Sequence, residues 1–155
     1  MQESDDRDLF YAMERLINSY WVDVDHNRGL NAHEFYTSDA VYSVGNNRFE
    51  GRNQIQAFYT RRRERGHSTT RHLLNQLQVS CDGARQGRIA GVMTLYRADG
   101  SPPFSGTPLP AMIADFDIRC ALGSDQRWYF ASHEVKPIFL GRDLPISITT
   151  DPARL

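Results

Sequence analysis

The sequence predicts an α+β fold in which a long N-terminal helix packs on a curved, mostly antiparallel sheet. Three observations favour this class. Apolar residues recur at helical spacing in the first part of the chain, four long strand-like segments follow, and turn residues separate those segments. Helices that precede a run of antiparallel strands are typical of α+β domains. A sheet curved around the helix would form a cone-shaped barrel with a ligand pocket at its open end.

The first helix is expected from about Asp5 to His26. Apolar side chains recur there every three or four residues, which indicates one buried stripe. Asn27 and Gly29 can end the helix in the left-handed conformation. The stripe consists of Leu9, Met13, Leu16, Ile17, Tyr20 and Val24.

Two shorter helices and a hairpin are predicted next. The helices fit residues 30–36 and 53–65, and the hairpin pairs residues 40–44 with the return strand RFEG. The second short helix would turn its apolar side chains inward and its arginines outward. We interpret the basic cluster as a solvated helix face rather than a phosphate-binding patch. Its members are Arg61, Arg62, Arg63 and Arg65.

Four long strands complete the expected sheet. The segments are TTRHLLNQLQVSC, GRIAGVMTLYRAD, AMIADFDIRCAL and RWYFASHEVKPIFL. The Pro- and Gly-rich loop 100–110 is long for a hairpin and could form a rim or lid. The tail 141–155 could cover the pocket or a neighbouring subunit. We expect residues 1–155 to form a single domain.

Composition argues against several functional classes. The formal net charge of the 155 residues is -1, which disfavours nucleic acid and anionic membranes as partners. No apolar run approaches the roughly 18 residues of a membrane span, and with no signal-peptide pattern we expect a cytoplasmic protein. Cys81 and Cys120 lack metal-site spacing, so we expect both to be small buried residues. No motif predicts a metal or a cofactor.

The stretch SYWVDVDHNRG places two acids near the end of the first helix. Helical geometry separates Asp23 and Asp25 by about 200° and puts Asp25 at the edge of the buried face, below Trp21. An aromatic neighbour, partial burial and the helix C-terminus would all disfavour a charged Asp25, as in general acid/base catalysis. The alternative is an exposed acid paired with Arg28 or His26. Asp23 is interpreted as a solvated acid.

The second candidate is His72, which would share one strand face with Thr70. It is either a structural histidine or, if it meets a carboxylate, a base whose tautomer that carboxylate fixes. Farther on, Asp115 and Asp117 share a strand face with Arg119. These three form either an ion pair or a polar pocket wall, with a structural role favoured.

The order of elements resembles the SnoaL-like branch of the nuclear transport factor 2-like superfamily. The matching pieces are YWVDVDHNRGLNAHEFYTSDAVYSV, FEGRNQIQAFY, RHLLNQLQV and RWYFASHEV. The active-site pattern is most similar to those of scytalone dehydratase, lindane dehydrochlorinase and bile-acid 7α-dehydratase. The resemblance implies a cofactor-independent lyase, dehydratase-like, on a small cyclic or polyketide-like molecule, and a homo-oligomer (dimer or trimer).

By position in that family, Asp25 and His72 correspond to a catalytic pair, and Tyr20 matches a tyrosine five residues before the aspartate. His72 would abstract a carbon-bound proton, and Tyr20 or Tyr42 would donate a hydrogen bond. The alternatives are an isomerase or cyclase with the same base, or a non-catalytic small-ligand-binding or oligomerisation module. The expected substrate-binding residues are Trp21, Tyr42, Phe49, Phe58, Met93, Met112, Asp115, Arg119 and Phe130. Asp117 is an alternative to Asp115.

Overall fold

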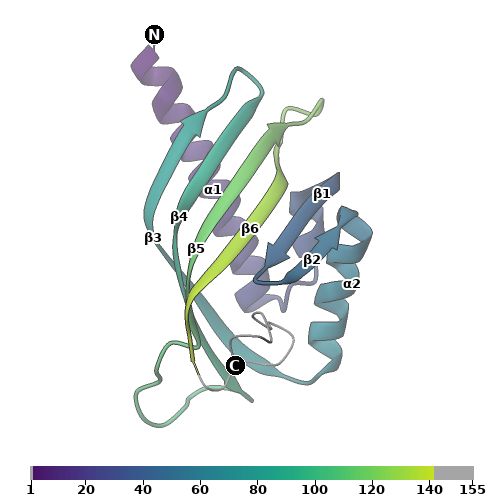
Figure 1. Ribbon diagram of the computed structural model, residues 1–155, viewed down its shortest axis with the longest axis vertical. Helices are drawn as coiled ribbons and strands as arrows, with labels where there is room; N and C mark the ends of the chain where they lie inside the picture. The colour runs from purple at the N-terminus through teal and green to yellow at the C-terminus, as the bar shows by residue number, and fades with distance from the viewer. Residues whose placement is uncertain (1, 142–155) are drawn as a thin grey trace.

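The computed structural model describes residues 2–141, with side chains from residue 5 onward. Two α-helices, one short 3-10 helix and six strands follow one another in this part of the chain (Figure 1). The tail prediction, apart from residue 141, lies outside the described residues. None of the described helices is long and apolar enough to cross a membrane. The elements are α1 (Gln2–His26), η1 (Ala32–Phe35), β1 (Tyr36–Val44), β2 (Asn47–Glu50), α2 (Gly51–Glu64), β3 (Ser68–Cys81), β4 (Gln86–Asp99), β5 (Met112–Leu122) and β6 (Trp128–Leu140).

The long helix α1 forms as predicted and ends at His26. Within its expected stripe, Leu9 and Leu16 are partly buried and the other four side chains are fully buried. Gly29 then adopts a φ of 69°, which an L side chain rarely adopts. A Cβ atom at this position would lie 2.4 Å from the Tyr59 ring. The glycine therefore both turns the chain and lets α2 approach the end of α1.

The two shorter helices differ from the prediction. The first is a single 3-10 turn, η1, because Tyr36 is already extended and buries its ring as the first residue of β1. The second, α2, begins at Gly51, two residues earlier than expected. There the side chain of Gln54 accepts a hydrogen bond of 2.8 Å from the backbone N–H of Glu50. This bond satisfies a donor that the helix start would otherwise leave unpaired.

The six strands form one sheet in the order β2-β1-β6-β5-β4-β3. β1 runs parallel to β6, and every other neighbouring pair is antiparallel, so the predicted mostly antiparallel sheet is confirmed. The sheet curves but does not close, with β2 at one edge and β3 at the other. In Figure 1, α1 crosses behind the long strands and α2 lies beside β1 and β2.

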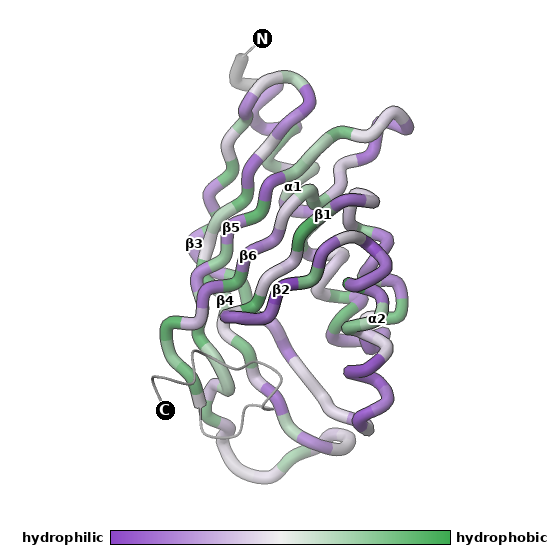
Figure 2. The backbone as a smooth tube through the Cα atoms, turned by 45° about the vertical axis from the view of Figure 1, so that its right-hand side comes forward, coloured by the Kyte–Doolittle hydropathy of each residue, from purple (hydrophilic) through white to green (hydrophobic). Residues whose placement is uncertain are grey.

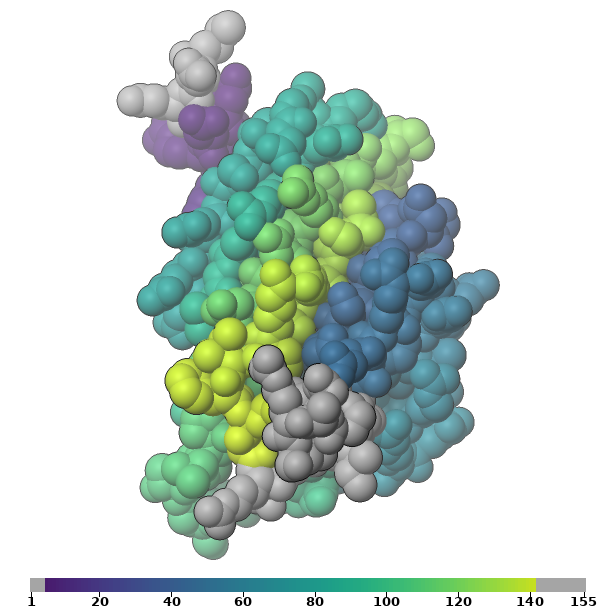
Figure 3. All heavy atoms as spheres, in the orientation of Figure 1, coloured from purple at the N-terminus to yellow at the C-terminus, as the bar shows by residue number. Residues whose placement is uncertain are grey.

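The core fills the space between α1 and the inner face of the sheet. Hydrophobic and hydrophilic residues alternate along the long strands (Figure 2), as expected for a sheet with one buried face. The outer face of the sheet hides most of α1 in the space-filling view, where the start of that helix emerges beyond β3 and β4 (Figure 3). Cys120 is buried as predicted, whereas Cys81 is exposed at the end of β3.

Candidate active site

Asp25, in the last turn of α1, meets His72 on β3. The Asp25 carboxylate oxygen Oδ1 lies 2.6 Å from His72 Nδ1, and Oδ2 accepts a hydrogen bond of 2.7 Å from the His72 backbone N–H. Thr70 donates a third hydrogen bond, from Oγ1 to Oδ1, at 2.8 Å. Both side chains of the pair are more than nine-tenths buried. The structure thus brings together the two residues that the sequence singled out.

The position of β3 in the sheet explains this contact. On its outer side, an edge strand has backbone N–H groups for which no neighbouring strand supplies a hydrogen-bond acceptor. At His72 the Asp25 carboxylate takes the place of that neighbour. The side chains of Thr70 and His72 share the face toward α1, as strand geometry predicts, while Arg71 and Leu73 are exposed.

Burial and hydrogen bonding set the charges of the pair. Burial raises the pKa of Asp25, but the hydrogen bonds and charge of His72, with the bond from Thr70, outweigh it and leave that pKa below its usual value. Burial lowers the pKa of His72, and the positive charge of Arg62 lowers it further, against the opposing effect of Asp25. An ionised carboxylate next to a neutral imidazole follows. Since Asp25 can only accept, Nδ1 carries the proton and Nε2 carries a lone pair.

Two expectations about the end of α1 need correction. A costly charge on Asp25 was expected from its surroundings, but three donors converge on the carboxylate and favour its ionised form. Asp23 is not simply a solvated acid, since its side chain accepts bonds of 2.7 Å from Asn27 Nδ2 and 3.1 Å from the Asn31 backbone N–H. Asp23 therefore holds the turn that follows the helix.

A cavity of about 120 Å³ opens beside His72, between α1, α2 and the sheet. Asp25 lies behind the imidazole and does not line this cavity. Five of the predicted substrate-binding side chains do line it. They are Trp21, Tyr42, Phe58, Met93 and Met112.

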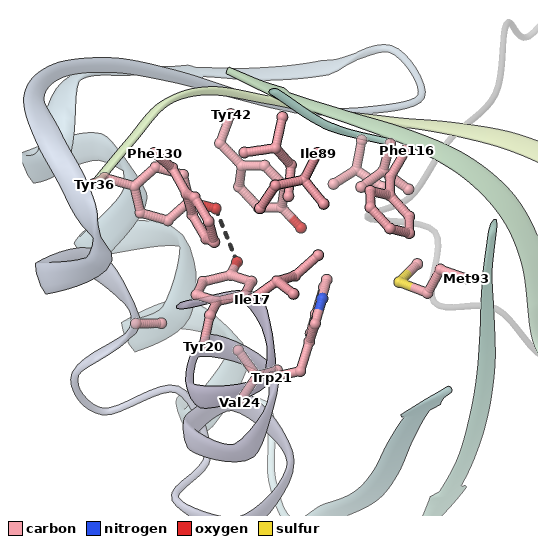
Figure 4. Packing of buried hydrophobic residues seen from close by; sticks show 14 of the residues in the cluster. Ile17, Tyr20, Trp21, Val24, Tyr36, Tyr42, Ile89, Met93, Phe116 and Phe130 are labelled. Atoms are coloured by element: carbon pink, nitrogen blue, oxygen red, sulfur yellow. Dashed lines mark hydrogen bonds between the residues drawn. The ribbon is translucent and has the colours of Figure 1, made fainter. Parts of the chain in front are cut away.

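Trp21 forms the wall next to the base. Its ring stacks on the His72 imidazole at a centroid distance of 4.0 Å and an interplanar angle of 19°. The indole Nε1 is buried and has no hydrogen-bond partner among the described residues. In Figure 4 the Tyr42 hydroxyl points toward this indole, and Met93 faces it across the intervening space. A buried donor without a partner is costly.

A buried chain of hydroxyl groups adjoins the cavity. Tyr36 donates a hydrogen bond of 2.9 Å to the Tyr20 hydroxyl, which also bonds the Tyr59 hydroxyl. The Tyr36 oxygen lies 2.8 Å from His133 Nδ1. Tyr59 lines the cavity but Tyr20, the predicted donor, does not, because Tyr20 lies behind Tyr59. Figure 4 shows the bond between Tyr36 and Tyr20.

Sequence reasoning missed His133 as part of the site's surroundings. Its ring is fully buried and stacks on Tyr42 at a centroid distance of 4.7 Å. Burial, with a smaller effect of His72, lowers the pKa of His133 to about 3, so this imidazole is neutral. Tyr36 gives its hydrogen to Tyr20, so His133 Nδ1 must donate to Tyr36. Burial raises the pKa of Tyr42 to about 12, despite the opposing charge of Arg62 and bonds to Tyr59 and Tyr20.

Four other predicted substrate-binding residues lie outside the cavity. Phe49 packs on Phe58 at a centroid distance of 4.6 Å and does not line the space. Phe130 is fully buried against the ring of Tyr20. Asp115 and Arg119 are exposed on the outer face of β5.

Asp117, the alternative to Asp115, also lies on this outer face, where Arg88 donates to its carboxylate. Arg119 pairs with Asp82 at 3.0 Å. The predicted shared face of the three β5 residues is correct, but it faces away from the pocket. Among the described residues, no group of three or more His, Cys, Asp or Glu side chains could hold a metal ion.

Comparisons with known proteins show the family and the fold. Residues 5–133 match the family model described as a SnoaL-like domain. No protein of curated function matches the chain significantly.

Solved structures show the same fold at low sequence identity. One, a putative scytalone dehydratase from Novosphingobium aromaticivorans, is 14% identical with a TM-score of 0.75, over 90% of this chain and 89% of that one. A second, ActVI-ORFA from Streptomyces coelicolor, is 11% identical with a TM-score of 0.72, over 84% and 98%. A third, from Catenulispora acidiphila in complex with S-DNPA, is 16% identical with a TM-score of 0.71, over 84% and 94%.

Proposed function

The chain belongs to the SnoaL-like family, and from this premise we propose that it is a cofactor-independent lyase that removes water from a small cyclic β-hydroxy ketone. The observation that carries the proposal is the bond of 2.6 Å between Asp25 and His72 beside the cavity. The carboxylate fixes one imidazole nitrogen as a donor, which leaves the other as a base. The depressed pKa of His72 keeps that base unprotonated at neutral pH.

In the proposed reaction, His72 Nε2 takes a proton from the carbon next to the ketone. The electron pair of the C–H bond moves into the carbonyl group and forms an enolate. The Tyr42 hydroxyl stabilises the enolate oxygen by hydrogen bonding. Tyr42 and His72 line the same cavity.

The second step expels the hydroxyl group. The enolate electrons return to form the carbon–carbon double bond, and the C–O bond at the β-carbon breaks. The leaving oxygen takes the proton held on His72 and departs as water, so the imidazole is neutral again. Atoms and charge balance without any further reactant. Asp25 stays ionised and compensates the transient imidazolium.

The surroundings of the pair support chemistry of this kind. The cavity walls are largely apolar, and a base and a hydrogen-bond donor act more strongly where water is excluded. One structural relative is described as a putative scytalone dehydratase, and another holds a small organic ligand. These relatives support a small-molecule site.

The proposal can be tested with 3-hydroxy-1-tetralone, because loss of water from this bicyclic β-hydroxy ketone gives fluorescent 1-naphthol. The wild-type protein should accelerate this conversion. His72→Ala and Asp25→Asn should each lower kcat by about 10²- to 10⁴-fold, the usual contribution of a general base. His26→Ala, which removes an exposed histidine one position from Asp25, should leave the rate unchanged.

A second assay separates the other functions. Incubation of 1-tetralone in D₂O reports proton abstraction without elimination, since deuterium then enters at C2. Exchange without dehydration would favour an isomerase or cyclase that uses the same base. Binding of the ketone without exchange or dehydration would favour a ligand-binding module and contradict the lyase proposal, as would full activity of His72→Ala.

A further inference from the structure

The cavity carries an excess of positive charge on one side. Arg62 and Arg65, in and just after α2, line it together with Arg97 of β4. Among the lining residues that the structure describes, Asp99 is the only carboxylate, and Arg97 already donates to it at 2.8 Å. Two arginines therefore contribute charge to the cavity that no acid in the described part of its wall compensates.

Arg62 is the more informative of these two side chains. It is half-buried, and its one hydrogen bond in the described part of the chain runs from Nη2 to Thr70 Oγ1, at 3.2 Å. A guanidinium has five N–H groups, so several donors are left for another partner. Within the described residues, neither Arg62 nor Arg65 forms an ion pair with a carboxylate.

The neighbouring arginines show that this is not a general property of the basic run. Arg61 is exposed and does not line the cavity. Arg63 donates to the Gly29 carbonyl at 3.1 Å, which ties α2 to the turn after α1. The solvated helix face predicted from the sequence is thus wrong for Arg62 and Arg63, whereas Arg61 and Arg65 are exposed as predicted.

The electrostatic setting favours an anion at this place. A half-buried guanidinium loses hydration, and a charged partner or further hydrogen bonds must replace it. Carboxylates match the fork of a guanidinium and can form two parallel charge-assisted bonds. Phe58, Leu95 and Met112 make the adjoining walls apolar, which weakens the screening of such a pair.

We infer that the cavity accepts a small cyclic carboxylate whose anionic group pairs with Arg62 and Arg65 while its ring lies against Trp21 and His72. This inference narrows the substrate class of the proposed function. It depends on the proposed function only for the identity of the reacting group. The size is consistent: about 120 Å³ corresponds to roughly ten water positions at about 10–15 Å³ each, enough for a compound of one or two rings.

Binding of 2-naphthoate and of its uncharged counterpart 2-naphthamide tests the inference by isothermal titration calorimetry. The His72→Ala variant is titrated beside the wild type, so that affinity is measured independently of turnover. In both, the carboxylate should bind about tenfold or more tightly than the amide, as expected for charge-assisted hydrogen bonds. A preference in both proteins therefore supports the anion site even if no lyase activity is found.

Three variants test which arginines cause the preference for the carboxylate over the amide. Arg62→Gln can keep a hydrogen bond to Thr70 but loses the charge, and should weaken 2-naphthoate binding about tenfold while changing 2-naphthamide binding less than twofold. Arg65→Gln, at an exposed position, should also weaken the binding of 2-naphthoate more than that of 2-naphthamide. Arg61→Gln removes the same charge outside the cavity and should change neither affinity. Equal binding of both probes, binding of neither, or a preference that survives the Arg62→Gln/Arg65→Gln double variant would overturn the inference.

Discussion

The buried imidazole of His133 should make the protein sensitive to mild acid. The side chain is 1% exposed, its Nδ1 is bonded to Tyr36, and its Nε2 has no partner among the described residues. Protonation in the folded state would place a charge among aromatic rings. In the unfolded chain the same imidazole titrates near its ordinary pKa of 6.5.

The size of the effect follows from the difference in pKa. With a folded pKa of about 3, the unfolded state binds one more proton than the folded state between about pH 6 and pH 3. Stability is therefore fully present above pH 6.5 and falls as the pH is lowered. His133 alone should cost about 2 kcal/mol of unfolding free energy at pH 5 relative to pH 7, with a slope of about 1.4 kcal/mol per pH unit below that.

Urea unfolding at a series of pH values between 7 and 4 measures this slope, with tryptophan fluorescence and far-UV circular dichroism as independent probes. His133→Gln replaces the imidazole with a side chain that does not titrate but can still bond Tyr36. The variant will lose ring packing and overall stability. Its slope below pH 6 should nevertheless be smaller than that of the wild type by about 1.4 kcal/mol per pH unit.

His72 contributes in the same direction, because its pKa is also lowered in the folded state, so some slope should remain in the variant. An unchanged slope in His133→Gln would show that this imidazole is accessible to protons in the folded protein and would refute the reasoning.

Three further outcomes can be measured by urea unfolding. Asp25→Ala leaves three buried donors without an acceptor and should cost about 3–5 kcal/mol of unfolding free energy. Asp25→Asn keeps one acceptor oxygen and should cost about 1–3 kcal/mol. Equal costs of the two variants would contradict the three-donor geometry. Gly29→Ala should cost more than about 1 kcal/mol, since its Cβ would meet the Tyr59 ring at a positive φ, and a neutral result would argue against that close approach. Asp117→Asn removes a partly exposed ion pair on the outer face of the sheet and should change the unfolding free energy by less than about 1 kcal/mol. The activity should not change. A loss of activity would indicate that the outer face takes part in the functional site.

Local periodicity was enough to predict part of the site. Helical spacing put Asp25 at the edge of the buried stripe, and strand alternation put Thr70 and His72 on one face, and both are observed. Their meeting depends on β3 being the sheet edge next to α1. That arrangement follows from strand order, which local sequence does not encode.

For the acids of β5 and for Arg62, the sequence pattern itself indicates the arrangement that the structure shows. Ala114, Phe116, Ile118 and Cys120 alternate with the acids of β5, and this apolar set marks the buried face. In α2, Arg62 lies three and seven positions after the buried Tyr59 and Ile55, so helical spacing places it on the inner face.

His133 could not be found in the same way. Phe130 and His133 are both buried although they are three residues apart, because the pairing of β5 with β6 shifts between Arg119 and Cys120. Simple alternation from Phe130 would turn His133 outward. A bulge of this kind reverses the inward and outward positions along a strand, and the local sequence gives no sign of it.

The central claim is that Asp25 holds His72 as a neutral base with its Nε2 open to the cavity. Long-range ¹H–¹⁵N correlation spectra of the imidazole at pH 7 test this without any substrate. We predict a neutral ring protonated on Nδ1, with Nε2 in the unprotonated form, and loss of this fixed tautomer in Asp25→Asn. A doubly protonated ring, or a proton on Nε2 in the wild-type protein, would contradict the proposed base.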